Sequence, residues 1–196
     1  MKWSYKILLY CCLLIVACKS PDNKQPIIVI ETEFGEIELT LYADKAPITA
    51  KAFLSYVEAD YYDHAQFYRV LHFDNQPSNA PKSLLIQGGI WKTNYKQAIA
   101  VKGIPHESTQ VTGIKHKTGV ISLARAEPGT AGTEFFICMD DEPGLDFGGE
   151  NVSDKLGYAA FGKVTKGMNI VKKIYGKKER NQYFEPPITI FSIYKK

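Results

Sequence analysis

Short runs of alternating apolar and polar residues recur along the chain, and such runs predict β-strands. The clearest is Glu36–Leu41, where three aliphatic residues alternate with two glutamates and a threonine. A period of two places the aliphatic side chains on one face of a strand. Because Phe34-Gly35 separates this run from a second strand over Ile27–Thr32, we expect a hairpin with one solvated face.

The same reasoning predicts further short strands, separated by loops rich in glycine, proline and asparagine. These strands are Phe67–Leu71, Leu84–Gln87, Val120–Leu123, Phe135–Ile137, Tyr158–Val164 and Ile188–Tyr194. Helical spacing of apolar residues predicts only two helices, from about Pro47 to Ala59 and over Gly167–Tyr175. Many short strands with two helices, no internal repeat and no second domain favour a closed barrel or sandwich capped by helices.

Three polar segments are predicted to be loops: His72–Ser83, Ile90–Thr118 and Asp140–Lys155. The second lacks strong periodicity and is long, which in a compact domain is typical of a functional or binding excursion. A small basic cluster, GIKHKTG at Gly113–Gly119, lies at its end, and we expect a solvated loop there.

The stretch Gly119–Met139 is the most informative part of the chain. It contains two strands joined by a loop with one proline and two glycines, a composition that allows the backbone to approach a ligand closely. Phe135 and Phe136 are adjacent, so one faces the core and the other faces away. A strand that is apolar on both faces is either an ordinary buried strand or the lining of an apolar pocket.

Length and charge narrow the class of protein. The 196 residues suffice for one domain with a sizeable core. The net charge is +3, from 24 basic and 21 acidic residues. Residues 1–17 carry Lys2 and Lys6 and no acid, so the remainder has 22 basic and 21 acidic residues, or +1. Such a balance gives no reason to expect nucleic acid as a partner.

The N-terminus has the parts of a secretory signal. Two lysines precede the apolar stretch Ile7–Ala17, which is too short to span a bilayer. The stretch ends in a small residue directly before Cys18, which resembles the lipobox of bacterial lipoproteins. We therefore expect a signal peptide at 1–17, a lipidated Cys18 with a polar tether at 18–26, and a folded domain at 27–196. A plain secretory signal with an accidental cysteine is the alternative.

Cysteines and histidines point to no conventional catalytic centre. Of four cysteines, Cys11 and Cys12 leave with the signal, Cys18 carries lipid, and Cys138 is expected to be a buried apolar residue without a disulfide. The four histidines have no metal-ligand spacing, and loop histidines are usually solvated. No nucleophile elbow, P-loop or dinucleotide motif is present, so we expect neither a metal nor a cofactor.

Five ordered motifs carry a resemblance to a known family. They are FYRV (Phe67–Val70), LIQGG (Leu85–Gly89), GVISLARA (Gly119–Ala126), GTEFFI (Gly132–Ile137) and GYAAFGKVTKGMNIV (Gly157–Val171). Together they resemble the cyclophilins, which are peptidyl-prolyl cis-trans isomerases, from Ile27 to the C-terminus. The resemblance implies a closed eight-stranded antiparallel β-barrel capped by two α-helices. It also implies proline-containing polypeptide substrates and a cofactor-free reaction, and we expect a monomer.

The resemblance also implies roles for particular residues. Arg69 matches the catalytic arginine, Gln87 the glutamine that bonds the substrate backbone, and Phe136 the floor of the proline pocket. The other matches form the pocket walls and the backbone-binding edge: Leu84, Leu85, Ala124, Arg125, Glu134, Leu145 and Tyr158. At Ala124 and Arg125 main-chain groups are expected to bind the substrate, so side-chain identity matters less. Taken singly, Arg69 also suits a surface salt bridge, and the apolar residues suit plain core packing.

The chain departs from the family pattern near the implied site. Tyr68 stands where the family often has histidine, Glu134 replaces a common glutamine, and Gly144 takes the place of a tryptophan seen in some members. Leu84 and Leu85 make the pocket wall aliphatic. Residues 74–82 are predicted to be an insertion close to the site.

Three hypotheses for the function follow. The first is a membrane-tethered prolyl isomerase that assists protein folding outside the cytoplasm, facing the periplasm or the cell exterior. The second is a proline-binding module or holdase that keeps the pocket without useful turnover, which the substituted wall residues suggest. The third is an interaction scaffold that uses the Ile90–Thr118 loop.

Overall fold

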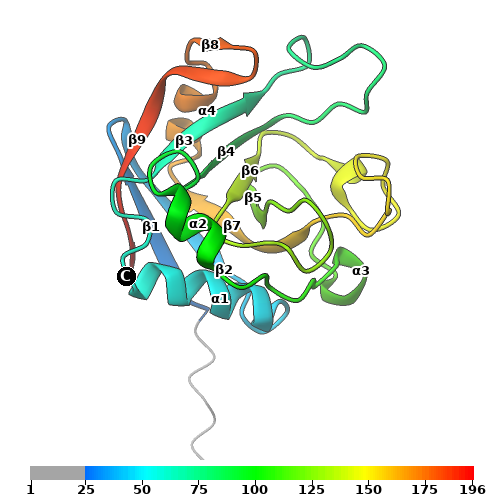
Figure 1. The fold of residues 1–196 in the computed structure, drawn as a ribbon, viewed down its shortest axis with the longest axis horizontal. Coiled ribbons are helices and arrows are strands. Elements are labelled where there is room, and N and C mark those ends of the chain that lie inside the picture. The colour runs from blue at the N-terminus through cyan, green and yellow to red at the C-terminus, as the bar shows by residue number, and fades with distance from the viewer. Residues whose placement is uncertain (1–24) are drawn as a thin grey trace, which may run out of the picture.

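The computed structural model describes residues 25–196, and its centre is a closed β-barrel (Figure 1). The strands are β1 (Ile27–Thr32), β2 (Gly35–Leu41), β3 (Gln66–Leu71), β4 (Leu85–Gly89), β5 (Val120–Leu123), β6 (Phe135–Cys138), β7 (Ala159–Lys166), β8 (Glu179–Arg180) and β9 (Tyr183–Lys195). They pair in the order β1-β2-β7-β5-β6-β4-β3-β9, and β1 also pairs with β9. This pairing closes an eight-stranded antiparallel barrel, as expected, while β8 is a two-residue partner of β9 outside the ring.

The predicted N-terminal hairpin shows how the sequence pattern fills the barrel. Ile30 of β1 lies opposite Ile37 of β2 across an antiparallel ladder that ends at Gly35. The alternating aliphatic residues of β2 and their partners on β1 are fully buried, and they form one side of the main core. The barrel interior is therefore packed with side chains and holds no channel.

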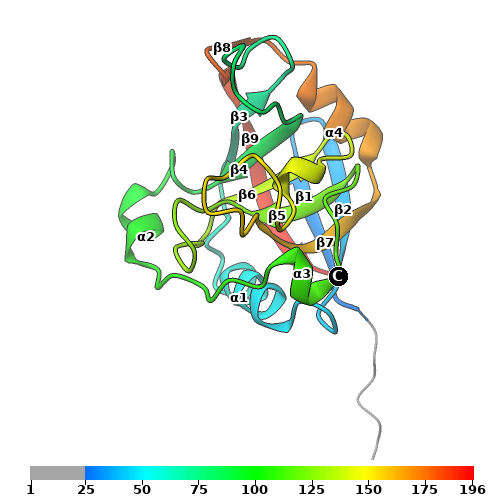
Figure 2. The ribbon, with the colours of Figure 1, turned by 90° about the vertical axis from the view of Figure 1, so that its right-hand side faces the viewer.

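Two substantial helices lie at opposite ends of the barrel, as the sequence predicted. Figures 1 and 2 show α1 (Pro47–Glu58) at the lower end and α4 (Met168–Tyr175) near the upper end. Helix α1 buries Ala50, Phe53 and Val57 against the core. Its first turn is capped from a distance, because the Glu107 carboxylate accepts hydrogen bonds from the backbone N–H of Ile48 and Thr49 at 3.2 and 2.6 Å.

The segment Ile90–Thr118 is more ordered than its sequence pattern suggests. It contains two short helices that the periodicity did not reveal, α2 (Tyr95–Ala100) and α3 (Thr109–Thr112). Helices of six and four residues are too short to display a helical period. The segment is also fastened to the barrel, since Ile90, Ile104 and Ile114 belong to the main core.

The expectations for the N-terminus mostly lie outside the described residues. The expected signal peptide, Cys18 and the tether up to residue 24 all lie outside residues 25–196. Residue 25 lies beside the turn before α1, where the Gln25 side-chain oxygen accepts from Ala43 N at 2.9 Å. No helix within residues 25–196 has the length and apolarity needed to cross a membrane.

Candidate active site

The doubled phenylalanine of β6 separates two hydrophobic clusters. Phe135 points into the barrel and packs in the main core, whereas Phe136 lies on the outer face. There it joins a second cluster made of Leu71, Leu85, Phe136, Cys138 and Leu145, with Ala124 and Tyr158 packed against it. The expected alternation is confirmed, and Cys138 is a buried free thiol as predicted. The candidate proline pocket around Phe136 therefore lies on the outside of the barrel wall.

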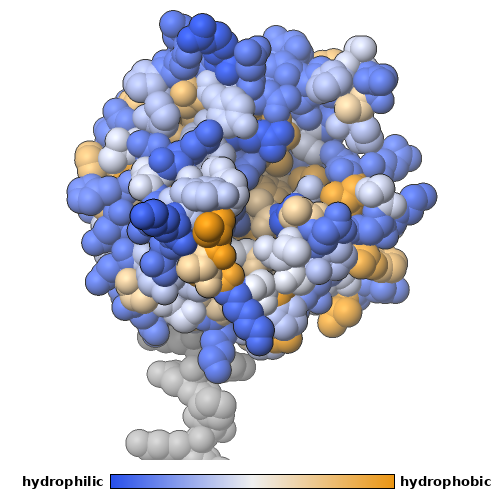
Figure 3. Space-filling model, in the orientation of Figure 1, coloured by the Kyte–Doolittle hydropathy of each residue, from blue (hydrophilic) through white to orange (hydrophobic). Residues whose placement is uncertain are grey.

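A cavity of about 260 Å³ lies over this second cluster, and we call it the apolar cavity after the hydrophobic side chains that form its floor. Its lining residues are Arg69, Leu71, Gln76, Pro81, Ser83, Leu85, Gln87, Ala124, Arg125, Phe136, Leu145, Asn151 and Tyr158. The ring of Tyr158 meets Phe136 edge to face, with centroids 5.3 Å apart. In the space-filling view, a hollow near the centre of the molecule is lined mainly by residues in the hydrophobic colours and rimmed mainly by hydrophilic residues (Figure 3).

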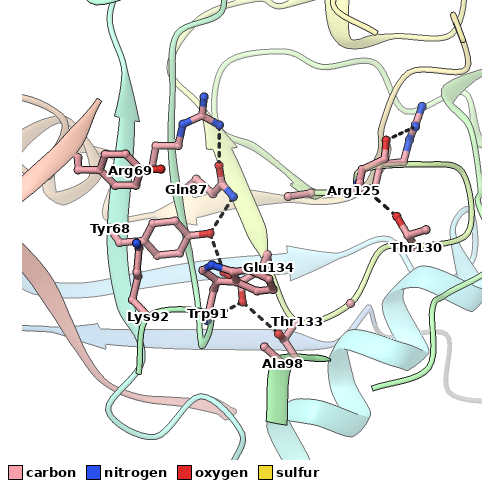
Figure 4. A pocket seen from close by; sticks show the side chains of 14 residues that line it. Tyr68, Arg69, Gln87, Trp91, Lys92, Ala98, Arg125, Thr130, Thr133 and Glu134 are labelled. Atoms are coloured by element: carbon pink, nitrogen blue, oxygen red, sulfur yellow. Dashed lines mark hydrogen bonds between the residues drawn. The ribbon is translucent and has the colours of Figure 1, made fainter. Parts of the chain in front are cut away.

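A second cavity of about 420 Å³ adjoins the first, and we call it the polar cavity after the hydrogen-bonded side chains of Gln87, Tyr68 and Glu134 that line it. Its lining residues are Tyr68, Arg69, Gln87, Trp91, Lys92, Ala98, Ala124, Arg125, Ala126, Thr130, Gly132, Thr133, Glu134 and Tyr183 (Figure 4). Four residues line both cavities: Arg69, Gln87, Ala124 and Arg125. The two cavities thus form one groove. We call the boundary between them the divide: Arg69 and Gln87 lie on one wall there, and the residues at the end of β5 lie on the other.

A β-bulge in β3 places two successive side chains in this groove. Phe67 lies opposite Gly88, but the next paired residue, Arg69, lies opposite Gln87, so Tyr68 is the extra residue. Phe67 and Val70 consequently face the main core, while Tyr68 and Arg69 both face outward. Without the bulge, strict alternation would send one of these two side chains into the barrel.

Two neutral amides hold the Arg69 guanidinium at the divide. Its Nη1 donates to Gln87 Oε1 at 3.2 Å, and its Nε and Nη2 donate to Gln182 Oε1 at 3.2 and 2.7 Å. Gln182 lies in the turn between β8 and β9, and its own Nε2 donates to the carbonyl oxygen of Asn75 in the insertion. Arg69 makes no salt bridge with any residue in 25–196, so its positive charge is available to a ligand in the groove.

A chain of hydrogen bonds continues from Arg69 into the polar cavity (Figure 4). Gln87 Nε2 donates to the Tyr68 hydroxyl at 2.8 Å, and this hydroxyl donates to Glu134 Oε2 at 2.8 Å. Burial raises the pKa of Glu134 above its ordinary value, although four hydrogen bonds to the carboxylate oppose this effect. Gly89 makes room for the carboxylate, because a Cβ at that position would overlap it.

Arg125 and Ala124 both have hydrogen-bond partners within the protein. The Arg125 side chain is only 1% exposed and forms a bidentate salt bridge with Asp154, at 2.8 and 2.9 Å. Its guanidinium also lies over the Tyr158 ring, 5.4 Å from the centroid, and donates to the Gly157 carbonyl oxygen. The side chain therefore fastens a wall of the apolar cavity. At Ala124 the backbone N–H already donates to Glu134 O at 2.9 Å.

A buried polar network supports the floor of the apolar cavity. The imidazole of His116 stacks against Phe136 at 6.0 Å, and its two nitrogens contact Asp146 Oδ1 at 2.8 Å and Ser122 Oγ at 3.0 Å. His116 is 1% exposed, so the prediction of a solvated loop is wrong at this residue. Burial alone would raise the pKa of Asp146, but hydrogen bonds from His116 outweigh it and hold the pKa below its ordinary value.

The structure brings the predicted catalytic and substrate-binding residues together in the groove, with one exception. Arg69, Gln87, Phe136, Leu85, Ala124, Arg125, Glu134, Leu145 and Tyr158 all line the groove. Leu84 lines neither cavity, since it precedes β4 and its backbone N–H donates to Glu142 Oε1. The space beside Gly144 is filled by Asn151, which lines the apolar cavity.

Several lining residues escaped sequence analysis. Trp91, Lys92 and Tyr183 form walls of the polar cavity, and Gln76 of the insertion lines the apolar one. Gln76 also braces its own loop by donating to His72 O at 2.7 Å and Ser83 O at 2.8 Å. No local pattern marks these residues, because they come from three separate parts of the chain, two loops and the first residue of β9. Among residues 25–196, no group of three His, Cys, Asp or Glu side chains is arranged to hold a metal ion.

Comparisons with known sequences all point to the same protein family. A family model described as "Cyclophilin type peptidyl-prolyl cis-trans isomerase/CLD" matches residues 27–195. The peptidyl-prolyl cis-trans isomerase of Acinetobacter baylyi is 36% identical over 146 residues, which are 74% of this chain and 69% of that protein. Peptidyl-prolyl cis-trans isomerase B of Escherichia coli is 33% identical over 150 residues, which are 76% of this chain and 84% of that protein.

Solved structures share the fold. A cyclophilin from Cryptosporidium parvum, crystallised in the presence of the dipeptide Ala-Pro, has a TM-score of 0.65 at 21% identity. The match covers 86% of this chain and 97% of that one. A second crystal structure of the same protein has a TM-score of 0.67 at 20% identity. At this level of identity the likeness concerns the barrel and its helices.

Proposed function

The chain belongs to the cyclophilin-type peptidyl-prolyl cis-trans isomerase family, and on this premise we propose that its active site is the groove around Arg69. We further propose that it acts as a lipid-anchored monomer on unfolded or extended polypeptides outside the cytoplasm. The observation that carries the site assignment is an arginine that makes no salt bridge within residues 25–196 and lies beside the apolar cavity, whose floor is Phe136.

The chemistry of prolyl isomerisation suits such a groove. An X–Pro bond prefers the trans form only slightly, but amide resonance sets a rotation barrier of about 18–20 kcal/mol. No covalent bond is broken, so neither a nucleophile nor a metal is required. A catalyst needs to bind the twisted amide better than either planar form. An acceleration of about 10³-fold requires roughly 4 kcal/mol of such preference.

In the proposed reaction the two cavities have separate tasks. The proline ring lies in the apolar cavity against Phe136, with Leu85, Leu145 and Tyr158 as walls. Arg69 then donates toward the prolyl nitrogen, which favours a pyramidal nitrogen and weakens the amide resonance. Gln87 holds Arg69 in place and bonds the substrate backbone. Preorganised donors of this kind supply several kcal/mol without reorganisation during the reaction.

The lipid anchor and the location rest on the sequence of residues 1–26. Their pattern is an apolar run that ends at Ala17-Cys18, followed by a polar segment. The position of residue 25 is compatible with a tether, because Gln25 bonds to Ala43 just before α1, and Figure 1 shows α1 below β3 and β4, the strands that carry Arg69 and Gln87. A domain held at this edge would keep its groove open to polypeptides.

An exchange assay on residues 25–196 tests the site assignment. The cis/trans exchange of an Ala-Pro peptide is measured by NMR for the wild type, Arg69→Ala, Arg69→Lys and Lys51→Ala. We expect Arg69→Ala to lose about 100-fold in exchange rate and Arg69→Lys to lose less, because lysine keeps the charge but not the fork of donors. Lys51→Ala removes an exposed charge on α1 and should match the wild type.

Two results would redirect this proposal. If Arg69→Ala exchanged the peptide as fast as the wild type, Arg69 would not be the catalytic residue. If the wild type bound the peptide without accelerating exchange, the protein would be a proline-binding module or holdase. The substituted residues of the groove, such as Tyr68 and Glu134, are the feature that suggests this second function.

The anchor has an independent test in cells that express the full chain. We expect the wild type to incorporate labelled palmitate and to sediment with membranes, and Cys18→Ala to do neither. Cys12→Ala is the matched control, because it changes a cysteine inside the expected signal peptide. Incorporation of palmitate by Cys18→Ala would contradict the lipid anchor and would leave the site assignment untouched.

A further inference from the structure

We propose that Tyr68 and Glu134 are positioning residues that fix the side-chain amide of Gln87, so that its oxygen always faces Arg69. In this arrangement the charge on Glu134 acts on the placement of the catalytic guanidinium through three successive hydrogen bonds. The inference rests on the proposed role of Arg69 as the catalytic residue.

The directions of the hydrogen bonds follow from counting protons. An ionised Glu134 has only acceptors, so the Tyr68 hydroxyl must donate its single proton to Oε2, which lies 2.8 Å away. The oxygen of Tyr68 is then left as an acceptor, and it requires a donor from Gln87. Only the Nε2 end of Gln87 supplies one, at 2.8 Å. The Oε1 end consequently points at Arg69 Nη1, 3.2 Å away.

Glu134 is held in a fixed position from which to exert this control. Its Oε1 accepts from the backbone N–H of Ile90 and Trp91 at 2.9 and 3.0 Å, and from Thr133 Oγ1 at 3.1 Å. Gly89 leaves the space that the carboxylate fills. With three donors on one oxygen, the carboxylate cannot rotate without breaking several bonds. The other oxygen therefore remains aimed at Tyr68.

Protonation of Glu134 would reverse the order of donors. A carboxylic acid proton on Oε2 donates to Tyr68, which is then free to donate to Gln87. The Gln87 amide accepts this proton by turning its oxygen toward Tyr68, and its NH₂ group then faces the donors of Arg69. Two donors facing each other repel, so Arg69 keeps only its contacts to Gln182. The guanidinium is then free to swing from its position at the divide.

The environment of Glu134 supports a transition on the acidic side of neutrality. Burial raises its pKa, which brings protonation closer to neutral pH than for an exposed glutamate. The charged and titratable groups that line the same cavity or lie close by are Tyr62, Tyr68, Arg69, Lys92, Arg125 and Tyr183. Burial holds the pKa of Tyr62 and of Tyr68 well above the ordinary value, and arginine stays protonated throughout.

The test compares pH profiles of three variants in the peptide exchange assay, from about pH 8 to about pH 4.5. Glu134→Gln removes the charge, and Tyr68→Phe removes the central hydroxyl. Tyr62→Phe is the matched control, because it deletes another buried tyrosine hydroxyl, which donates to Thr133 O at 2.9 Å outside the relay. Thermal melts and the separate effects on kcat and KM are recorded for each.

The wild type should lose kcat on acidification, with KM changing less than twofold. Glu134→Gln and Tyr68→Phe should have about fivefold to tenfold lower kcat at pH 7 and should lack the acidic loss. Tyr62→Phe should keep the rate and the pH profile of the wild type. A merely structural role for Tyr68 and Glu134 would lower the melting temperature without removing the pH dependence.

Two outcomes would overturn the relay. One is an acidic loss that persists in Glu134→Gln, since a group other than Glu134 would then be responsible. The other is a wild-type rate in Tyr68→Phe, which would mean that Gln87 keeps its orientation unaided. Arg69→Ala in the same experiment distinguishes a failure of the relay from a failure of the site assignment. If it too had the wild-type rate, the site assignment would fail, and not the relay alone.

Discussion

The two cavities of the groove share Arg69 and Gln87, yet each is backed by a carboxylate with the opposite behaviour. Behind the apolar cavity, Asp146 is paired with His116, and its pKa is held below the ordinary value. At the base of the polar cavity, Glu134 has only neutral donors within hydrogen-bond distance, and its pKa is raised by burial. The first carboxylate supports a floor, whereas the second is placed where a change of charge reaches the arginine.

The difference shows two ways of building a binding surface outside a barrel. The apolar cavity depends on buried area, since Phe136, Leu85 and Leu145 belong to a hydrophobic cluster of their own. The polar cavity depends on hydrogen-bond direction, and its walls combine residues of β3, β4 and β9 with residues of the loops that follow β4 and β5. We therefore expect variants of the apolar cavity to act through affinity and stability, and variants of the polar cavity to act through rate and charge preference.

The largest effect should come from Phe136→Ala. Truncation removes the floor of the apolar cavity and should lower kcat/KM about 100-fold, mainly by raising KM. It should also cost about 3 kcal/mol in the free energy of unfolding, as large-to-small changes of buried aromatics do. Peptide exchange measures kcat and KM, and chemical denaturation measures the free energy of unfolding. If kcat fell with KM unchanged, burial of the proline ring against Phe136 would not contribute to substrate binding.

A smaller loss is expected from Gln182→Ala, which removes the acceptor on the other side of Arg69. Two of the three hydrogen bonds to the guanidinium end on this residue. We expect kcat to fall about fivefold, or roughly 1 kcal/mol, with KM nearly unchanged. Gln97→Ala on α2 is the matched control, because it shortens a glutamine that does not line the groove. Equal rates for both variants would show that Gln87 alone holds Arg69.

The two carboxylates should also respond oppositely in stability. The lowered pKa of Asp146 means that its ionised form stabilises the fold above the unfolded pKa of about 4, and that this contribution is lost as pH falls further. For Glu134 the raised pKa has the reverse sign, so ionisation costs stability as pH rises through its folded pKa.

Denaturation curves of Asp146→Asn and Glu134→Gln between about pH 3 and about pH 7 test this contrast. Asp146→Asn should lose about 1 kcal/mol near neutrality and converge on the wild type in acid. Glu134→Gln should be least stable relative to the wild type in acid, and its deficit should shrink or vanish as pH rises. The same trend for both variants would remove the distinction between the cavities.

The smallest effect should be a charge preference in the polar cavity. The Lys92 ammonium lies 5.0 Å from the centroid of the Tyr183 ring at the wall of this cavity. Peptides with glutamate two residues before proline should have kcat/KM about threefold above those with lysine there, and Lys92→Glu should reverse the order. Because such exposed charges are screened, about 0.5 M salt should abolish the difference in both proteins. A preference that survives salt would have another origin.

Much of the barrel could be predicted from the sequence, because its strands carry strong local patterns. The hairpin of β1 and β2 and the doubled Phe135-Phe136 are examples, since their alternation alone assigns an inner and an outer face. The start of β9 was missed: the strand begins at Tyr183, whereas the predicted strand begins at Ile188, after Pro186 and Pro187. Helix α2 escaped because six residues cannot show a period.

The groove was only partly predictable, for physical reasons. The bulge at Tyr68 depends on the close approach of Gly88 to β3, which is a tertiary contact with no local sequence pattern. Gln182 reaches Arg69 only because the β8–β9 turn folds back over β3. His116 looked like part of a solvated basic loop, yet its neighbours Asp146 and Ser122 come from distant segments and keep it buried.

The closure of the barrel by β1 and β9 brings Lys196 within hydrogen-bond distance of Ile27, with its N–H 2.9 Å from the Ile27 carbonyl oxygen. A short peptide joining residue 196 to residue 27 would therefore leave every strand pairing intact. New ends placed in the exposed part of the 74–82 insertion would give a circular permutant. Such a permutant should fold, and its termini would emerge beside the groove, where a substrate peptide fused in sequence would have a high effective concentration.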